Sequence, residues 1–88
     1  MATDFSRVIG DWDLKLHEIR MLKEHADLVK QIHENLQFLP PKQAHAWPRT
    51  PNDNPMFGGR PPLVLMLIGR EGLERVLRFI LSENGGPL

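Results

Sequence analysis

A stretch rich in proline and glycine in the middle of this chain limits its possible folds more than any other feature. Residues 47–63 read Trp-Pro-Arg-Thr-Pro-Asn-Asp-Asn-Pro-Met-Phe-Gly-Gly-Arg-Pro-Pro-Leu. Each proline fixes φ, removes a backbone donor and disfavours helical geometry in the residue before it. The stretch therefore cannot form one helix or one strand. Its large apolar residues, Trp47, Met56 and Phe57, predict a shaped loop anchored to the rest of the fold.

The residues before this loop carry helical periodicity. Apolar residues recur every three or four positions from Trp12 to Leu39, and Asp11 suits an N-cap. We therefore expect one long amphipathic helix over residues 12–38. Residues 1–10 are expected to form either a short helix or a loose N-terminal arm.

Proline residues predict where the next helices begin. Pro41 suits the first position of a short helix that runs through Trp47. Pro62 suits the same position before the apolar run of residues 63–68, which fits either a buried helix or a short strand. Residues 70–82 show the clearest amphipathic pattern, and the Asn-Gly-Gly-Pro sequence at 84–87 is typical of a helix end.

These patterns predict an all-α fold, a small bundle of about four helices. The 88 residues suffice for one domain, so we expect residues 11–88 to form a single helical domain. A chain of this size buries only about 60–65% of its surface on folding. Because about 50 remaining residues are too few to cover a helix over 12–38, that helix is predicted to mediate a homodimer.

Composition and charge exclude several function classes. The net charge is zero, with five basic and seven acidic residues in 1–40 and six and four in 41–88, which makes nucleic-acid binding unlikely. There is no cysteine, and the start lacks the pattern of a signal peptide. The longest apolar run is shorter than the about 20 residues that span a bilayer. We expect a cytoplasmic protein without membrane contact.

Candidate residues for catalysis are few. His17, His25 and His33 are spaced by eight, so on one helix they would spiral without converging. The only serines, Ser6 and Ser82, have no histidine and carboxylate evidently placed to activate them. We therefore expect no enzymatic activity, no metal and no cofactor.

The glycine pair at Gly58 and Gly59 precedes an expected helix, as in a phosphate cradle. Pro61 and Pro62, however, remove two of the backbone donors that such a cradle uses. The glycines are better explained by a tight turn of the loop. Arg60 is free in this interpretation to bond loop carbonyls or a carboxylate of a partner.

The central and C-terminal motifs together resemble a known family. Trp47-x-Arg49-Thr50-Pro51-Asn52, Asn54-Pro55-x-x-Gly58-Gly59-Arg60-x-Pro62-Leu63 and Glu71-Gly72-x-x-x-Val76 are similar to the toxin-binding domain of Xre/MbcA/ParS-type antitoxins. The resemblance covers about residues 41–86. The DNA-binding Xre domain that usually precedes this domain has no counterpart in the sequence, and Asn84 stands where the family usually has histidine.

This resemblance implies a bacterial antitoxin-like module that neutralises a RES-domain toxin, an NAD-consuming enzyme. In the family, the end of the last helix and the residues after it occlude the toxin's active site. Carried over by position and extended to the adjacent helix face, the predicted partner-binding residues are Arg75, Arg78, Phe79, Ser82, Glu83, Asn84, Gly85, Gly86, Pro87 and Leu88. The predicted structural residues of the loop are Trp47, Arg49, Pro51, Asn52, Pro55, Gly58, Gly59, Arg60 and Pro62. The alternatives are a DNA-binding transcriptional regulator and a freestanding dimeric adaptor without a toxin.

Overall fold

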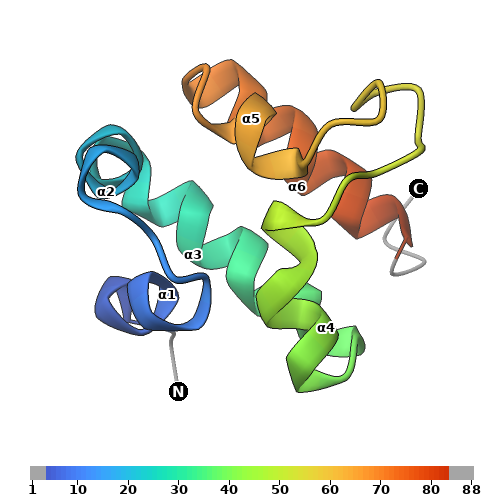
Figure 1. Ribbon diagram of the computed structural model, residues 1–88. Coiled ribbons are helices and arrows are strands. Elements are labelled where there is room, and N and C mark those ends of the chain that lie inside the picture. Colours follow the sequence, from blue (N-terminus) through green and yellow to red (C-terminus); the bar gives the residue numbers. More distant parts are fainter. Residues whose placement is uncertain (1–3, 84–88) are drawn as a thin grey trace.

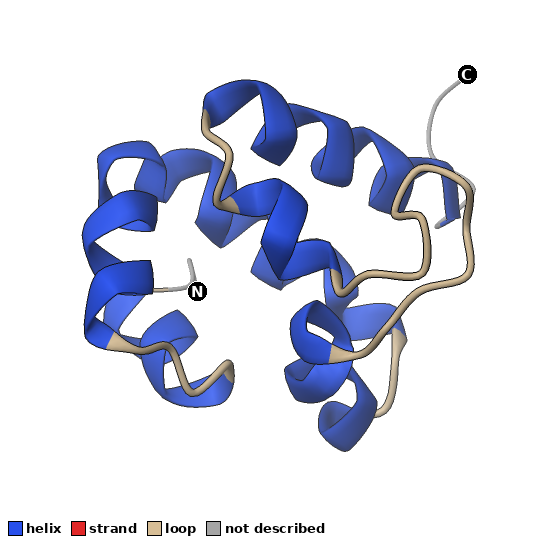
Figure 2. Ribbon diagram, turned by 45° about the horizontal axis from the view of Figure 1, so that its top comes forward, coloured by secondary structure: helices blue, strands red, loops and turns tan. Residues whose placement is uncertain are grey.

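The computed structural model describes residues 4–83, in which short helices follow one another and a long loop over residues 50–61 separates the last two from the rest (Figure 1). The α-helices are α1 (Phe5–Asp11), α2 (Leu16–Leu22), α3 (Ala26–Asn35), α4 (Pro41–Ala46), α5 (Pro62–Met66) and α6 (Arg70–Glu83). Single 3₁₀ turns occur at Lys23–His25, Leu36–Phe38 and Trp47–Arg49. Within residues 4–83 there is no strand, as Figure 2 shows, and the prediction of an all-α fold is confirmed.

The prediction of one long helix over residues 12–38 is wrong. Helix α1 ends at Asp11, and Trp12 is its C-cap. Asp13 follows with a φ of 52°, in the left-handed region. The Asp13 N–H bonds the Gly10 carbonyl and the Leu14 N–H bonds the Ile9 carbonyl, which is the hydrogen-bond pattern of a Schellman helix end. The expected N-cap, Asp11, is instead the last residue of α1, whose own N-cap is Asp4.

A second break separates α2 from α3. His25 has φ −126° and ψ 40°, so the chain changes direction at the Lys23–His25 turn. The apolar periodicity across residues 12–38 is real, but it is divided between two helices, α2 and α3, and the 3₁₀ turns that follow them. Trp12, Leu22, Val29 and Ile32 are each at most 1% exposed inside the chain.

Helix α3 lies in the middle of the molecule, with α1 packed on one side and α6 on the other (Figure 1). Its buried face meets apolar residues from every other part of the fold. The largest fully buried side chains of the core are Trp12, Leu22, Ile32, Leu36, Met66, Leu73 and Ile80. The core is therefore assembled across the chain, and the packing of α3 against α6 is its largest helix–helix contact.

The shorter helices begin as the prolines predict. Pro41 and Pro62 stand in the first turns of α4 and α5, so the run at 63–68 begins as helix and not as strand. The amphipathic pattern at 70–82 corresponds to α6. Its Gly72 is required by close packing, because a Cβ there would lie 2.0 Å from the Leu65 carbonyl oxygen.

A homodimer is predicted from the sequence because the rest of the chain could not cover a single helix over residues 12–38. In the structure, the chain itself covers most of the apolar residues of this range. The exposed large apolar residues of the range are Leu16, Met21 and Phe38. Dimerisation stays a prediction. Within residues 4–83 none of the helices has both the length and the apolar character needed to cross a membrane.

Candidate functional site

An open groove of about 490 Å³ lies at the C-terminal end of α6, where the chain leaves the described part of the structure. Its sides come from the 36–39 segment, the start of the central loop and the last turns of α6. The lining residues are Leu36, Phe38, Leu39, Trp47, Asn52, Asp53, Asn54, Phe79, Ile80 and Glu83. Phe38 is 53% exposed, so a large apolar side chain stands at the groove with more than half its surface in water.

Three aromatic rings pack against one another at this groove, and two of them line it. Trp47 and Phe79 stack with ring centroids 6.3 Å apart and an angle of 20° between planes. Phe57 meets both edge-on, at 6.0 Å from Trp47 and 5.3 Å from Phe79. Such packing fixes the rings of Trp47 and Phe79 in place, because aromatic pairs add about 0.5–1.5 kcal/mol beyond area burial.

A second hollow of about 400 Å³ lies next to the groove. Leu39 and Trp47 line both. Its further lining comes from Lys42, Gln43, Ala46 and Thr50. The two hollows thus adjoin at the Leu39 and Trp47 side chains, and the walls of the second are mainly apolar. Adjoining hollows of this form suit a segment of another protein, which would bury large side chains there.

The rim of the 490 Å³ groove is acidic. Asp53 and Glu83 are exposed, and within residues 4–83 neither carboxylate has a hydrogen bond or an ion pair. The amide residues Asn52 and Asn54 stand beside Asp53 along the loop. Two unpaired carboxylates next to apolar walls favour a partner segment that brings a basic side chain together with apolar ones.

The loop that carries Asp53 is held by its own hydrogen bonds. The Asn52 side chain accepts from the Asn54 N–H and the Asn54 side chain accepts from the Met56 N–H, both at 2.9 Å. Such Asx turns explain why asparagine occurs at these positions. Gly58 and Gly59 have φ of 59° and 80°, the left-handed region that favours glycine.

Arg49 joins this loop to the start of the chain. Its Nη2 lies 2.6 Å from Glu18 Oε1, its Nε donates to the Trp12 carbonyl at 3.0 Å, and Nη2 also donates to the Asp13 carbonyl at 2.7 Å. The guanidinium thus satisfies carbonyls at the end of α1 and a carboxylate of α2 together. Planar, multidentate bonding of this kind requires arginine and not lysine.

Glu18 is 5% exposed, and its pKa reflects several neighbours. Burial by itself raises the pKa of this carboxyl. The Lys15 N–H, which donates at 2.7 Å, and the hydrogen bonds and charge of Arg49 outweigh burial, so the pKa of Glu18 lies below its ordinary value. Glu18 therefore stays ionised at neutral pH as the partner of Arg49.

A second polar cluster gathers around Asp11. One oxygen of its carboxylate lies 2.8 Å from His33 Nε2, 3.4 Å from His45 Nε2 and 3.6 Å from Arg7 Nε. Burial raises the pKa of Asp11, but the hydrogen bond from His33 and the charges of His45, His33 and Arg7 lower it more, so the net shift is downward. Because His33 of α3 is hydrogen-bonded to this carboxylate oxygen and His45 of α4 lies close to it, the cluster connects α1, α3 and α4.

The predicted partner-binding residues divide between two places. Phe79 and Glu83 line the groove, whereas Arg75, Arg78 and Ser82 are exposed on α6 outside its lining. Arg75 is paired with Glu71 at 3.1 Å. The predicted residues at positions 84–88, Asn84, Gly85, Gly86, Pro87 and Leu88, lie outside the described residues.

The predicted loop residues also have distinct surroundings. Trp47 packs in the aromatic cluster, Arg49 pairs with Glu18, and Pro62 is buried at the start of α5. Pro51 and Pro55 are exposed, and Pro55 lines a different groove beside α5 together with Arg60.

Sequence reasoning missed several members of these sites. The apolar stripe expected before the central loop runs to Leu39 and does not include Phe38, and the spacing of neither residue indicates a groove wall. His45 was not connected with His33, because the two meet only through Asp11 of a third helix. Phe79 is predicted only as a partner-binding residue of the last helix, and its stacking on Trp47 is not indicated by the sequence. The signal that could have placed it is its position four residues before Glu83, on the same side of α6.

Across residues 4–83, no group of three or more His, Cys, Asp or Glu side chains is arranged to hold a metal ion. No protein-family model, curated protein or solved structure matches this chain. The functional interpretation therefore depends on the motif resemblance and on the geometry of the grooves.

Proposed function

We propose that this chain is a non-enzymatic protein-binding module of the antitoxin type, acting in the bacterial cytoplasm. Its partner is a RES-domain toxin, and the C-terminal end of α6 holds that NAD-consuming enzyme inactive. The observation that carries the proposal is the exposed aromatic groove at the end of α6, which lies where the motif resemblance locates toxin contacts.

The chemistry of the groove supports a protein partner over a small molecule. Its walls are apolar and open, Phe38 stands more than half exposed, and the acidic rim has unpaired carboxylates. Exposed apolar patches rimmed by polar residues mark protein interaction sites. Aromatic anchors whose positions are already fixed lose little conformational entropy when a partner binds.

The test is inhibition of a RES-domain toxin encoded beside this chain in its native host. Cellular NAD is measured while the toxin is expressed alone, with the full chain, or with a chain lacking residues 83–88. The full chain should preserve NAD, and the truncated chain should not, although circular dichroism shows that it keeps its helices. Inhibition by the truncated chain would contradict the proposed role of the C-terminal end.

A pair of point variants tests the groove itself. Phe38→Ala removes the exposed groove aromatic, and Leu16→Ala removes a side chain that is 63% exposed on α2, away from the groove. We expect Phe38→Ala to weaken toxin binding by about tenfold or more, and Leu16→Ala to leave it unchanged. Equal effects of the two variants would exclude the groove as the toxin contact. Failure of the full chain to bind any toxin would favour an adaptor function.

A further inference from the structure

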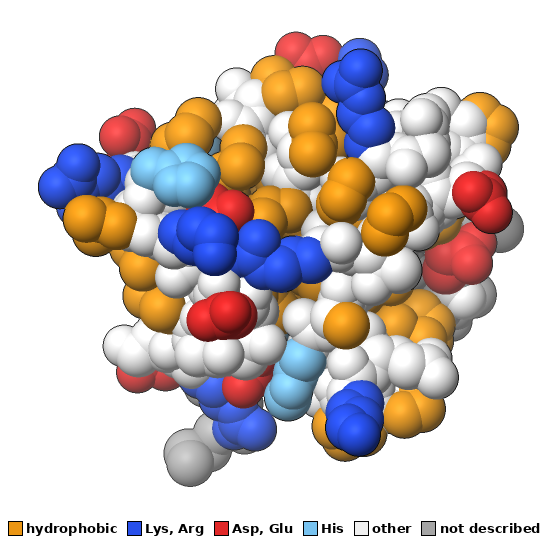
Figure 3. Space-filling view, viewed as in Figure 1, with side chains coloured by type: hydrophobic (Ala, Val, Ile, Leu, Met, Phe, Trp, Pro, Cys, Tyr) orange, Lys and Arg blue, Asp and Glu red, His pale blue; other side chains and the backbone are white. Residues whose placement is uncertain are grey.

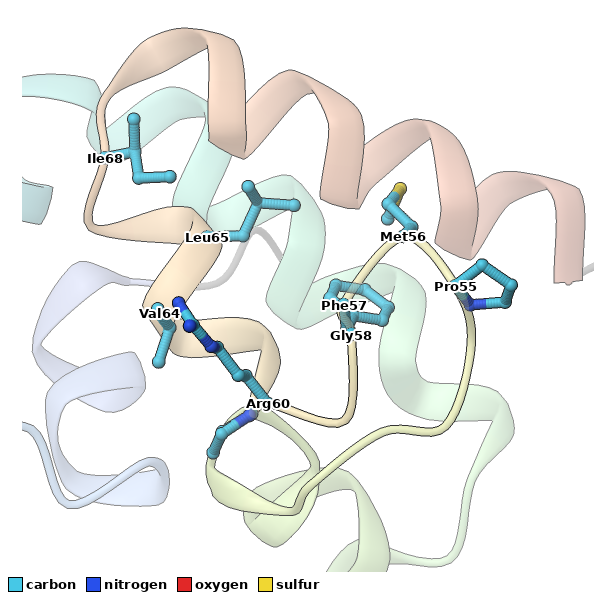
Figure 4. Close-up of a pocket in the computed structure, with 9 residues that line it drawn as sticks. Pro55, Met56, Phe57, Gly58, Arg60, Val64, Leu65 and Ile68 are labelled. Atoms are coloured by element: carbon cyan, nitrogen blue, oxygen red, sulfur yellow. The ribbon is translucent and has the colours of Figure 1, made fainter.

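A separate groove of about 320 Å³ lies between the central loop and α5 (Figure 4). We call it the α5 groove. Its lining includes Met56 and Phe57 of the loop and Val64, Leu65 and Ile68 of the α5 segment. Val64 is 43% and Ile68 71% exposed, and Figure 3 shows hydrophobic side chains gathered on the face over α5. This surface belongs to none of the sites predicted for toxin binding.

Arg60 supplies the charge of this groove. Of the nine described residues that line it, Arg60 is the one with a charged side chain, and within residues 4–83 its guanidinium has no hydrogen bond or ion pair. Figure 4 shows this side chain extending along the groove toward Val64. An unpaired guanidinium beside apolar side chains offers a carboxylate two parallel hydrogen bonds in a partly dry setting.

The backbone that presents Arg60 is held in place before any partner arrives. The Arg60 N–H donates to the Phe57 carbonyl at 3.0 Å, and the Arg60 carbonyl accepts from the Asn52 N–H at 3.2 Å. Pro61 follows and restricts Arg60 to extended conformations. Binding here would order only the arginine side chain, which keeps the entropic cost of association low.

We propose that the α5 groove docks a segment of a second protein in which a carboxylate side chain stands next to large apolar ones. The docked segment needs an acidic side chain because Arg60 has no partner within residues 4–83. It needs apolar side chains because Val64, Leu65 and Ile68 line the groove. The groove is near the lower limit of the about 300–1,000 Å³ typical of ligand pockets, so it receives one or two side chains and not a whole helix. The α5 groove is separate from the 490 Å³ groove at the C-terminal end of α6. This proposal therefore does not depend on the function proposed for that groove.

The experiment selects short random peptides on the immobilised full chain, after peptides that bind an Arg60→Glu variant have been removed. Peptides that are retained should carry Asp or Glu beside Leu, Ile or Phe. For one synthetic peptide from this set, Arg60→Glu and Ile68→Asp should each raise Kd by at least about tenfold in fluorescence anisotropy. Arg20→Glu is the matched control, because this arginine of α2 is exposed and, within residues 4–83, has no hydrogen bond or ion pair; it should change Kd by less than about twofold.

Charge reversal separates recognition from a structural role of Arg60. The same peptide with lysine in place of its acidic residue should bind Arg60→Glu more tightly than it binds the unaltered chain. Retained peptides without acidic residues, or no rescue by the lysine peptide, would overturn the proposal. A dimer in sedimentation that Ile68→Asp converts to monomer would also overturn it, because a second copy of the chain would then occupy the groove.

Discussion

Arg49 and Glu18, which are 31 positions apart, form the ion pair that fixes the central loop to the first turn of α2. Their closest atoms, Arg49 Nη2 and Glu18 Oε1, are 2.6 Å apart, and the Glu18 side chain is 7% exposed. The same guanidinium bonds the carbonyls of Trp12 and Asp13 at the end of α1. The central loop is thus joined to the N-terminal part of the chain, at the end of α1 and the start of α2.

Substitution of Arg49 by methionine should destabilise the protein strongly. The variant leaves the buried Glu18 carboxylate without its partner, which typically costs about 3–5 kcal/mol. Urea unfolding followed by circular dichroism measures the change. The double variant Glu18→Met with Arg49→Met should lose less stability than Arg49→Met alone, because no buried charge remains. An Arg49→Met protein within about 0.5 kcal/mol of the unaltered chain would contradict the assigned role.

Asp11→Asn should change how stability depends on pH. The pKa of Asp11 is lowered in the folded protein, so this carboxyl contributes stability above its unfolded pKa, near 3.8, and the contribution is lost as pH falls through the folded pKa. We expect the variant to be less stable by about 1–2 kcal/mol near pH 7. Between about pH 5 and pH 2 the unaltered chain should lose stability more steeply than the variant. Urea unfolding midpoints of both proteins, measured across this pH range, test the prediction. Midpoints that fall in parallel with pH for the variant and the unaltered chain would exclude the predicted contribution of Asp11.

Gly72→Ala should disturb the contact of α5 with α6. The added Cβ would lie 2.0 Å from the Leu65 carbonyl oxygen, so one helix must shift, at a cost of about 1–3 kcal/mol. Gly10→Ala is the matched control, because nothing lies within 4 Å of a Cβ at that helical position. The control should be neutral or stabilising by up to about 1 kcal/mol. Thermal unfolding compares them, and equal midpoints for the two variants would disprove the close approach.

Phe57→Leu should loosen the aromatic cluster and not merely remove volume. Phe57 is 5% exposed and meets Trp47 and Phe79 edge-on, so its loss should cost about 1–3 kcal/mol. The near-ultraviolet circular dichroism signal of the aromatic rings should fall with it. Phe38→Ala, which alters an exposed ring, should leave both stability and this signal close to those of the unaltered chain. A large stability loss in Phe38→Ala would show that this ring belongs to the core.

The sequence by itself determined the helical class, the start of α4 at Pro41, the helical start of the run after Pro62 and the amphipathic α6. These features depend on local properties: proline at the first helical position, glycine at a left-handed turn and apolar spacing of three and four. The glycines of the central loop are explained in the same local terms, by positive φ at Gly58 and Gly59.

Only the tertiary structure decided where the first helical segment breaks and which residues meet. Spacing of apolar residues does not distinguish one long helix from two shorter helices with a change of direction between them, and Asp13 in a left-handed turn gives no pattern to detect. The pairing of Arg49 with Glu18 and of Asp11 with two histidines joins residues that are distant in sequence. Both grooves arise in the same way, because a hollow is formed by the packing of several elements and not by the pattern of any one of them.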